Sequence, residues 1–271
     1  MKEWDSVFFR SGELRLHAAH YPGSGSLPMV VVPGITTPAS AFGVAAARLA
    51  DIAADVYVLD MRGRGLSQRA PYGGHRAGDY ADDVLALIEH LGNQRPVLVG
   101  HSLGARVVAS ARARFPGGSA GAVAIDPPMS GPGRRPYPIP LDRLINGLHG
   151  AREGRGIEMA RVGYPTWTEE EITQRAEGLA SCDETALVES YTWFHLEAFE
   201  PIWAQVEPPA LLLYGAESPV VTAEDAASLE RVNPRAEHVA VAHSGHMVPW
   251  DNLDQTVHEI EAFVSKLGAS A

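Results

Sequence analysis

The stretch VLVGHSLGAR, at residues 97–106, runs from branched apolar residues into two glycines that flank a serine. The apolar run is typical of a short buried strand, and the residues after it favour a helix. At a strand-to-helix turn the hydroxyl of Ser102 would stand above the carboxyl edge of a sheet, and the glycines permit the sharp bend. The five-residue pattern is weak alone, because 27 of the 271 residues are glycine. Its context has to separate a nucleophile from an ordinary turn.

Apolar runs and helical patterns alternate on both sides of this turn. Residues 6–20 predict a hairpin around positions 11–12. The other segments predict a mainly parallel sheet with helices on both faces. The expected strands are 29–34, 55–60, 97–100, 122–126, 210–215 and 236–241, and the expected helices are 39–50, 78–91, 103–115, 223–232 and 252–267.

The alternation stops in the middle of the chain. Residues 127–150 are rich in Pro, Gly and Arg, which is unsuited to a central strand, and 157–200 have a helical pattern. The simplest interpretation is a core formed by 1–130 and 205–271, interrupted by a helical cap over 131–204.

Composition excludes several classes of protein. The net charge of -11 argues against nucleic-acid binding, which needs basic patches, and the single cysteine, Cys182, excludes an internal disulfide. We expect no membrane partner and a cytoplasmic location, because neither a signal peptide nor a run of 18 apolar residues is evident. HExxH and EF-hand patterns are absent, so we expect no metal and no cofactor. The oligomeric state stays open.

A serine nucleophile needs a base and an oxyanion site. His246 lies in HSGHMVPWD, on the loop between the last expected strand and helix, and His243 is its nearest rival. His101 adjoins the nucleophile, but the turn directs its side chain away. The amide of Leu103, at a helix N-terminus, is positioned to stabilise an oxyanion.

These motifs together resemble the α/β-hydrolase superfamily. They are PGIT at 33–36, DMRGRGLS at 60–67, GHSLG at 100–104 and GHM at 245–247, in the order Ser…acid…His. More closely, DPPMSGPGRRPYP and GHMVPWDNLD resemble the N-formylmaleamate deformylases of nicotinic acid breakdown. The resemblance implies an α/β-hydrolase fold and a serine hydrolase without cofactor, acting on a small acidic amide.

The acid of the triad has two candidates. Most of the superfamily carries it in the loop after the cap, here YGAESPVVT, where the usual position holds Ser218 and Glu217 is one residue early. Asp126 ends the strand that follows the nucleophile helix, a position that some members use and to which the deformylase resemblance points. We expect Asp126, with Glu217 as substitute or helper; a turn cap is the alternative for Asp126.

The remaining candidates concern the substrate. The Ile35 amide, after the first central strand, is the expected second oxyanion donor, and Thr36 is expected either to touch substrate or to cap a helix. Arg106 is the first candidate for an anionic substrate, ahead of Arg134 and Arg135. Trp193 is one of several aromatic residues expected either to wall the pocket or to pack the cap.

The sequence thus predicts a metal-independent serine hydrolase that cleaves the C–N bond of a small acidic amide, with N-formylmaleamate, giving maleamate and formate, as the leading substrate. A carboxylesterase or lactonase with the same triad is the alternative enzyme. A non-catalytic ligand-binding protein is the alternative of another class, because this fold also serves as a receptor.

Overall fold

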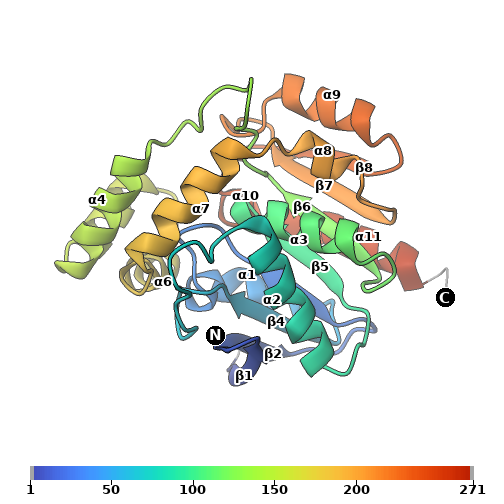
Figure 1. Ribbon diagram of the computed structural model, residues 1–271, viewed down its shortest axis with the longest axis horizontal. Coiled ribbons are helices and arrows are strands. Elements are labelled where there is room, and N and C mark those ends of the chain that lie inside the picture. Colours follow the sequence, from blue (N-terminus) through green and yellow to red (C-terminus); the bar gives the residue numbers. More distant parts are fainter. Residues whose placement is uncertain (1–2, 269–271) are drawn as a thin grey trace.

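The computed structural model describes residues 3–268 and contains an eight-stranded sheet in the order β1-β2-β4-β3-β5-β6-β7-β8 (Figure 1). β1 and β2 form an antiparallel hairpin, β2 pairs antiparallel with β4, and every later pairing is parallel. The expected hairpin and parallel sheet are therefore confirmed. The strands are β1 Asp5–Ser11, β2 Leu14–Pro22, β3 Met29–Val32, β4 Asp55–Asp60, β5 Val97–His101, β6 Gly121–Ile125, β7 Ala210–Gly215 and β8 Glu237–Val241.

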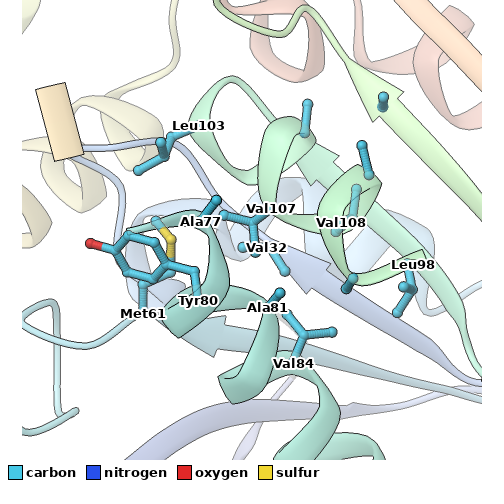
Figure 2. Packing of buried hydrophobic residues seen from close by; sticks show 14 of the residues in the cluster. Val32, Met61, Ala77, Tyr80, Ala81, Val84, Leu98, Leu103, Val107 and Val108 are labelled. Carbon is cyan, nitrogen blue, oxygen red and sulfur yellow. The ribbon is translucent and has the colours of Figure 1, made fainter. Parts of the chain in front are cut away.

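Helices cover both faces of the sheet because its central strands are apolar on both sides. In β3, Val30 and Val32 face one hydrophobic cluster, whereas Met29 and Val31 face another. Figure 2 shows the first cluster, where Val32 and apolar side chains of α2 and α3 meet. The helices of these layers are η1 Ala39–Phe42, α1 Gly43–Leu49, α2 Ala77–His90, α3 Leu103–Arg114, α9 Ala223–Val232, α10 Val248–Asp251 and α11 Leu253–Gly268.

A group of helices separates β6 from β7 in the chain. We call α4–α7 the cap helices, and Figure 1 shows α4 standing well away from the sheet. α4 begins at Leu141, so the helical region starts earlier than the expected 157. The core and cap boundaries stay an interpretation of this arrangement. The helices are α4 Leu141–Arg152, α5 Gly156–Gly163, α6 Glu169–Ala180, α7 Glu184–Leu196 and the short α8 Glu200–Trp203.

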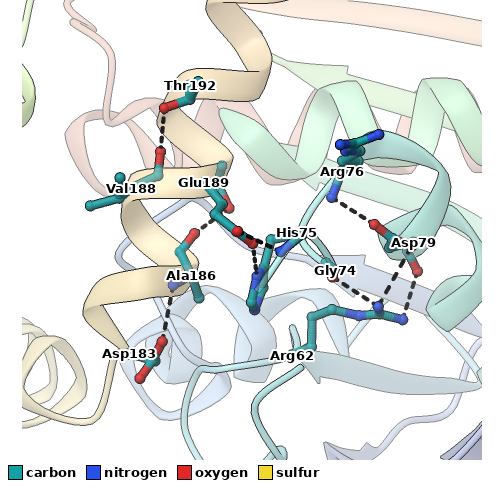
Figure 3. Close-up of polar contacts among 12 residues, drawn as sticks. Arg62, Gly74, His75, Arg76, Asp79, Asp183, Ala186, Val188, Glu189 and Thr192 are labelled. Carbon is teal, nitrogen blue, oxygen red and sulfur yellow. Dashed lines mark hydrogen bonds and ion pairs between the residues drawn. The ribbon is translucent and has the colours of Figure 1, made fainter. Parts of the chain in front are cut away.

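Polar contacts join α7 to the loop before α2 (Figure 3). The Nδ1 atom of His75 lies 2.5 Å from Oε2 of Glu189, whose Oε1 accepts a hydrogen bond from the Gly73 amide at 2.6 Å. Arg62 anchors the same loop, because its guanidinium donates to Asp83 and to the carbonyl of Gly74. Burial lowers the pKa of His75. These contacts hold the middle of α7, at Glu189, against the loop before α2.

Candidate active site

Ser102 occupies the turn between β5 and α3, in a backbone conformation that side chains rarely adopt. Its φ and ψ are 56° and -119°, and its amide donates to the Ile125 carbonyl at 2.8 Å. The two flanking glycines are needed for packing: a Cβ at Gly104 would overlap the Val32 carbonyl, and one at Gly100 would overlap the Gly104 carbonyl. The sharp turn therefore requires glycine on both sides of the serine.

His246, in the loop between β8 and α10, links Ser102 to a carboxylate. Its Nε2 lies 3.0 Å from the Ser102 Oγ, and its Nδ1 lies 2.7 Å from Oδ2 of Asp126. With Asp126 ionised, Nδ1–H donates to the carboxylate and leaves Nε2 free to accept the serine proton. The structure thus brings together three residues that the sequence analysis singled out from distant segments.

Asp126 follows β6 and is completely buried. Its carboxylate accepts hydrogen bonds from the Gly215 amide at 3.1 Å and from the Ser218 hydroxyl at 2.7 Å, in addition to His246. Burial raises the pKa of Asp126, and these donors oppose that shift. Ser218 is a partner that the sequence analysis missed: it stands at the usual acid position and supports the acid instead of supplying it.

Glu217 and His243 lie outside this arrangement. Their side chains are 70% and 91% exposed, and Oε1 of Glu217 is 3.9 Å from Nδ1 of His243. Asp126, not Glu217, occupies the acid's place beside His246. Glu217 as substitute acid therefore has no geometric support.

The expected oxyanion donors lie on either side of Ser102. Leu103 is the first residue of α3, where amides have no partner within the helix. The loop carrying Ile35 lies against Ser102, because a Cβ on Gly34 would come within 3.4 Å of the Ser102 Cβ. An anion at Ser102 would therefore face this helix end and this loop.

A cavity of about 310 Å³ adjoins this loop at Thr36 and extends between the cap helices α4, α5 and α6. Arg175 donates to the Thr36 carbonyl at 2.6 Å and to the Thr36 hydroxyl at 2.9 Å. Arg143, an exposed residue of α4, also lines the cavity, and its guanidinium forms no ion pair within residues 3–268. The sequence analysis missed both arginines, because isolated cations on amphipathic helices carry no motif. Thr36, an expected contact, does line the cavity.

Arg106 and Trp193 lie elsewhere, in the packing between α3 and α7. The buried Arg106 guanidinium donates to backbone carbonyls that include Pro128 at 2.9 Å, and burial lowers its pKa to about 10. The Trp193 indole donates to Glu197 at 2.5 Å. Neither residue lines the cavity between the cap helices. Their contacts are with the protein's own backbone and side chains, which is the packing alternative of the sequence analysis. Arg134 and Arg135 pair with Asp225.

Two further aromatic rings surround His246. The Tyr137 hydroxyl lies 3.1 Å from Nε2 of His246. His101 lies on the other side, and its Nε2 donates to the His246 carbonyl at 2.8 Å. Burial lowers the pKa of His101 to about 3, so its ring is neutral at physiological pH. His101 therefore contacts the loop of the base through the backbone.

Two features are absent from the part of the chain that is described. No three side chains of His, Cys, Asp or Glu in residues 3–268 are grouped so that they could hold a metal ion. In the same range, no helix has the length and apolar character needed to cross a bilayer.

Comparison with known proteins places this geometry in context. The family model described as "alpha/beta hydrolase fold" matches residues 28–253. N-formylmaleamate deformylase from Pseudomonas putida is 37% identical over 241 residues, which cover 89% of each chain. The 2-(acetamidomethylene)succinate hydrolase from Mesorhizobium japonicum is 32% identical over 257 residues, again 89% of each chain. The resemblance inferred from the sequence motifs is therefore confirmed.

Solved structures agree with these relatives. A crystal structure of an N-formylmaleamic acid deformylase variant, also from Pseudomonas putida, superposes with a TM-score of 0.86 at 34% identity and covers 95% of this chain and all of that one. The structure of E-2-(acetamidomethylene)succinate hydrolase gives a TM-score of 0.79 at 28% identity, covering 97% of this chain and all of that one. The predicted fold class is confirmed by these neighbours.

Proposed function

The chain belongs to the α/β hydrolase fold family, and from this premise we propose that it is a serine-dependent hydrolase of the C–N bond in a small acidic amide, with N-formylmaleamate as substrate. One observation carries the proposal: Ser102, His246 and Asp126 form a hydrogen-bonded chain, and the loop that packs against Ser102 at Gly34 continues to Thr36, which lines a cavity together with two arginines. Two relatives that are named for the cleavage of acidic amides support the same substrate class.

Acylation begins when the Ser102 Oγ attacks the formyl carbon and its proton passes to Nε2 of His246. The negative oxygen of the tetrahedral intermediate is held by the amides of Leu103 and Ile35. The C–N bond then breaks, Nε2 returns the proton to the nitrogen, and maleamate leaves a formyl group on Ser102. Asp126 stabilises the imidazolium throughout.

In the second half of the reaction, water hydrolyses the formyl ester on Ser102. His246 takes a proton from the water as its oxygen attacks the formyl ester, and then protonates Oγ as formate leaves. The serine and the neutral imidazole are thereby restored. Asp126 retains its charge in both halves.

The leaving group explains why a triad suffices without a metal ion. Its nitrogen carries a second acyl group, so the electron pair released by C–N cleavage is delocalised onto that carbonyl. Such a nitrogen is less basic than an amine and departs with protonation by His246 alone. The formyl group has no acyl arm and needs little space above Ser102.

The substrate carboxylate is assigned to the cavity between Thr36 and the cap helices. A guanidinium binds a carboxylate through parallel N–H donors. Arg143 and Arg175 supply two such groups, and they line the cavity together with Thr36, the residue after Ile35. This local positive charge contrasts with the net charge of -11 of the whole chain.

The test is to incubate the purified protein with N-formylmaleamate and to measure formate and maleamate, with and without a chelator. Equal amounts of both products that survive chelation support the proposal. Absence of formate together with rapid cleavage of p-nitrophenyl esters would indicate the esterase or lactonase alternative. Failure of a fluorophosphonate to label Ser102 in the folded protein would indicate a non-catalytic binding protein.

A further inference from the structure

Tyr137 brings a second hydroxyl to the reacting atoms. The loop between β6 and α4 carries this residue into the site, where its side chain is buried against Phe194 of α7. Its hydroxyl is 3.1 Å from Nε2 of His246, the atom that also lies 3.0 Å from the Ser102 Oγ. The reaction outlined above does not use the hydroxyl of Tyr137.

The hydrogen-bonding role of the Tyr137 hydroxyl depends on whether Nε2 of His246 carries a proton. At rest, the single lone pair of Nε2 accepts the proton of Ser102. After the serine proton has transferred, Nε2 carries a proton and accepts no hydrogen bond, so the O–H of Tyr137 is available to an acceptor on the substrate. The leaving group must lie there, because it takes its proton from Nε2. Burial raises the pKa of Tyr137, so the phenol stays a neutral donor.

On the basis of the proposed function, we infer that Tyr137 is a further catalytic residue, whose hydroxyl donates a hydrogen bond to the leaving-group oxygen on which negative charge develops. In the amide this is the carbonyl oxygen of maleamate. The Oγ–C bond has formed, the C–N electron pair moves to nitrogen and partly onto that oxygen, and Nε2 protonates the nitrogen. Tyr137 keeps its proton throughout.

With this role, Tyr137 should accelerate the reaction most for substrates with poor leaving groups. A leaving group that is already stable, such as p-nitrophenolate, gains little from an extra donor, whereas a more basic one gains much. Loss of one donor to a developing negative charge typically lowers the rate by about 10²-fold. A residue that only supports packing would affect both kinds of substrate equally.

The experiment compares Tyr137→Phe with Tyr191→Phe. The control removes the same hydroxyl from a neighbouring ring, 6.2 Å away by centroids, whose hydroxyl donates to the Ile139 carbonyl and not to His246. We expect Tyr137→Phe to lower kcat/KM for N-formylmaleamate by about 10²-fold and to leave p-nitrophenyl formate nearly unchanged. The control should retain activity on both, and thermal unfolding verifies that each variant is folded.

Equal losses on both substrates, or no loss on either, would overturn the inference. If the wild-type protein releases no formate from N-formylmaleamate, it is the proposed function that fails, and a series of substituted phenyl formates then decides about Tyr137. Tyr137→Phe should steepen the dependence of log kcat/KM on the leaving-group pKa, whereas an unchanged slope rules the role out.

Discussion

At the scale of single residues, the hydrogen bond between Ser102 and His246 predicts that the two side chains act as one unit. Ser102→Ala removes the nucleophile and His246→Ala removes its base, so each should lower turnover by about 10⁴-fold or more. The double variant should be hardly slower than either single one. Steady-state formate release measures all three, and near-normal turnover by folded Ser102→Ala contradicts the assignment.

The two candidate acids make opposite predictions. Asp126 bonds Nδ1 of His246 at 2.7 Å, whereas Glu217 is largely exposed beside His243. Asp126→Asn should therefore lower kcat by about 10⁴-fold, because the amide no longer favours the required imidazole tautomer. Glu217→Gln should change it little. The reverse ranking in folded proteins would move the acid to the loop after β7.

His101 predicts a pH dependence of stability. Its folded-state pKa is lowered to about 3 from its ordinary value of 6.5. Between these values the unfolded chain binds a proton that the native ring does not, so stability is full above pH 6.5 and falls with decreasing pH, by up to about 1.4 kcal/mol per unit.

Urea unfolding at pH 7, 6 and 5 compares the wild-type protein with His101→Gln. Glutamine cannot take up this proton but retains a donor for the His246 carbonyl. The variant should lose about 2 kcal/mol less than the wild type between pH 7 and 5. Parallel curves would show that another group governs the acid sensitivity.

At the scale of elements, α4 predicts where substrate charge is recognised. Arg143 of this helix lines the cavity and forms no ion pair with any described residue. Arg143→Gln should raise KM for an acidic amide by about tenfold or more, the effect of one charge-assisted hydrogen bond, and should spare neutral esters.

Arg161→Gln is the matched control, because Arg161 is exposed on α5 and pairs with Glu169 on α6 outside the cavity. It should leave KM unchanged. A drop in kcat alone for Arg143→Gln, or an equal effect on p-nitrophenyl formate, would place the carboxylate elsewhere.

The helices and strands differ in how well they could be predicted from the sequence. Buried parallel strands are continuous apolar runs, so β3, β5 and β7 were predictable, and the glycines around Ser102 located the turn. α4 was obscured by the Pro-rich residues that precede it. The roles of Arg106 and Arg143 could not be separated, because an arginine's surroundings depend on how distant helices pack, which a local pattern does not encode.

At the scale of the whole molecule, the parallel topology assembles the site. Ser102, Asp126 and His246 follow β5, β6 and β8, and the carboxyl ends of these strands share one edge of the sheet. The order along the chain predicted this convergence, whereas the cavity depends on cap helices whose packing against that edge no local pattern encodes.

Because β8 is an edge strand of the sheet, partial unfolding there can affect activity before the rest of the fold opens. This strand pairs only with β7 and is more solvent-accessible than its neighbour. Border segments with few buried contacts open locally at lower free energy than the centre. His246 depends on that strand, whereas Ser102 follows the central β5. Under the proposed mechanism, transient detachment of β8 therefore abolishes activity while most amides remain protected from hydrogen exchange.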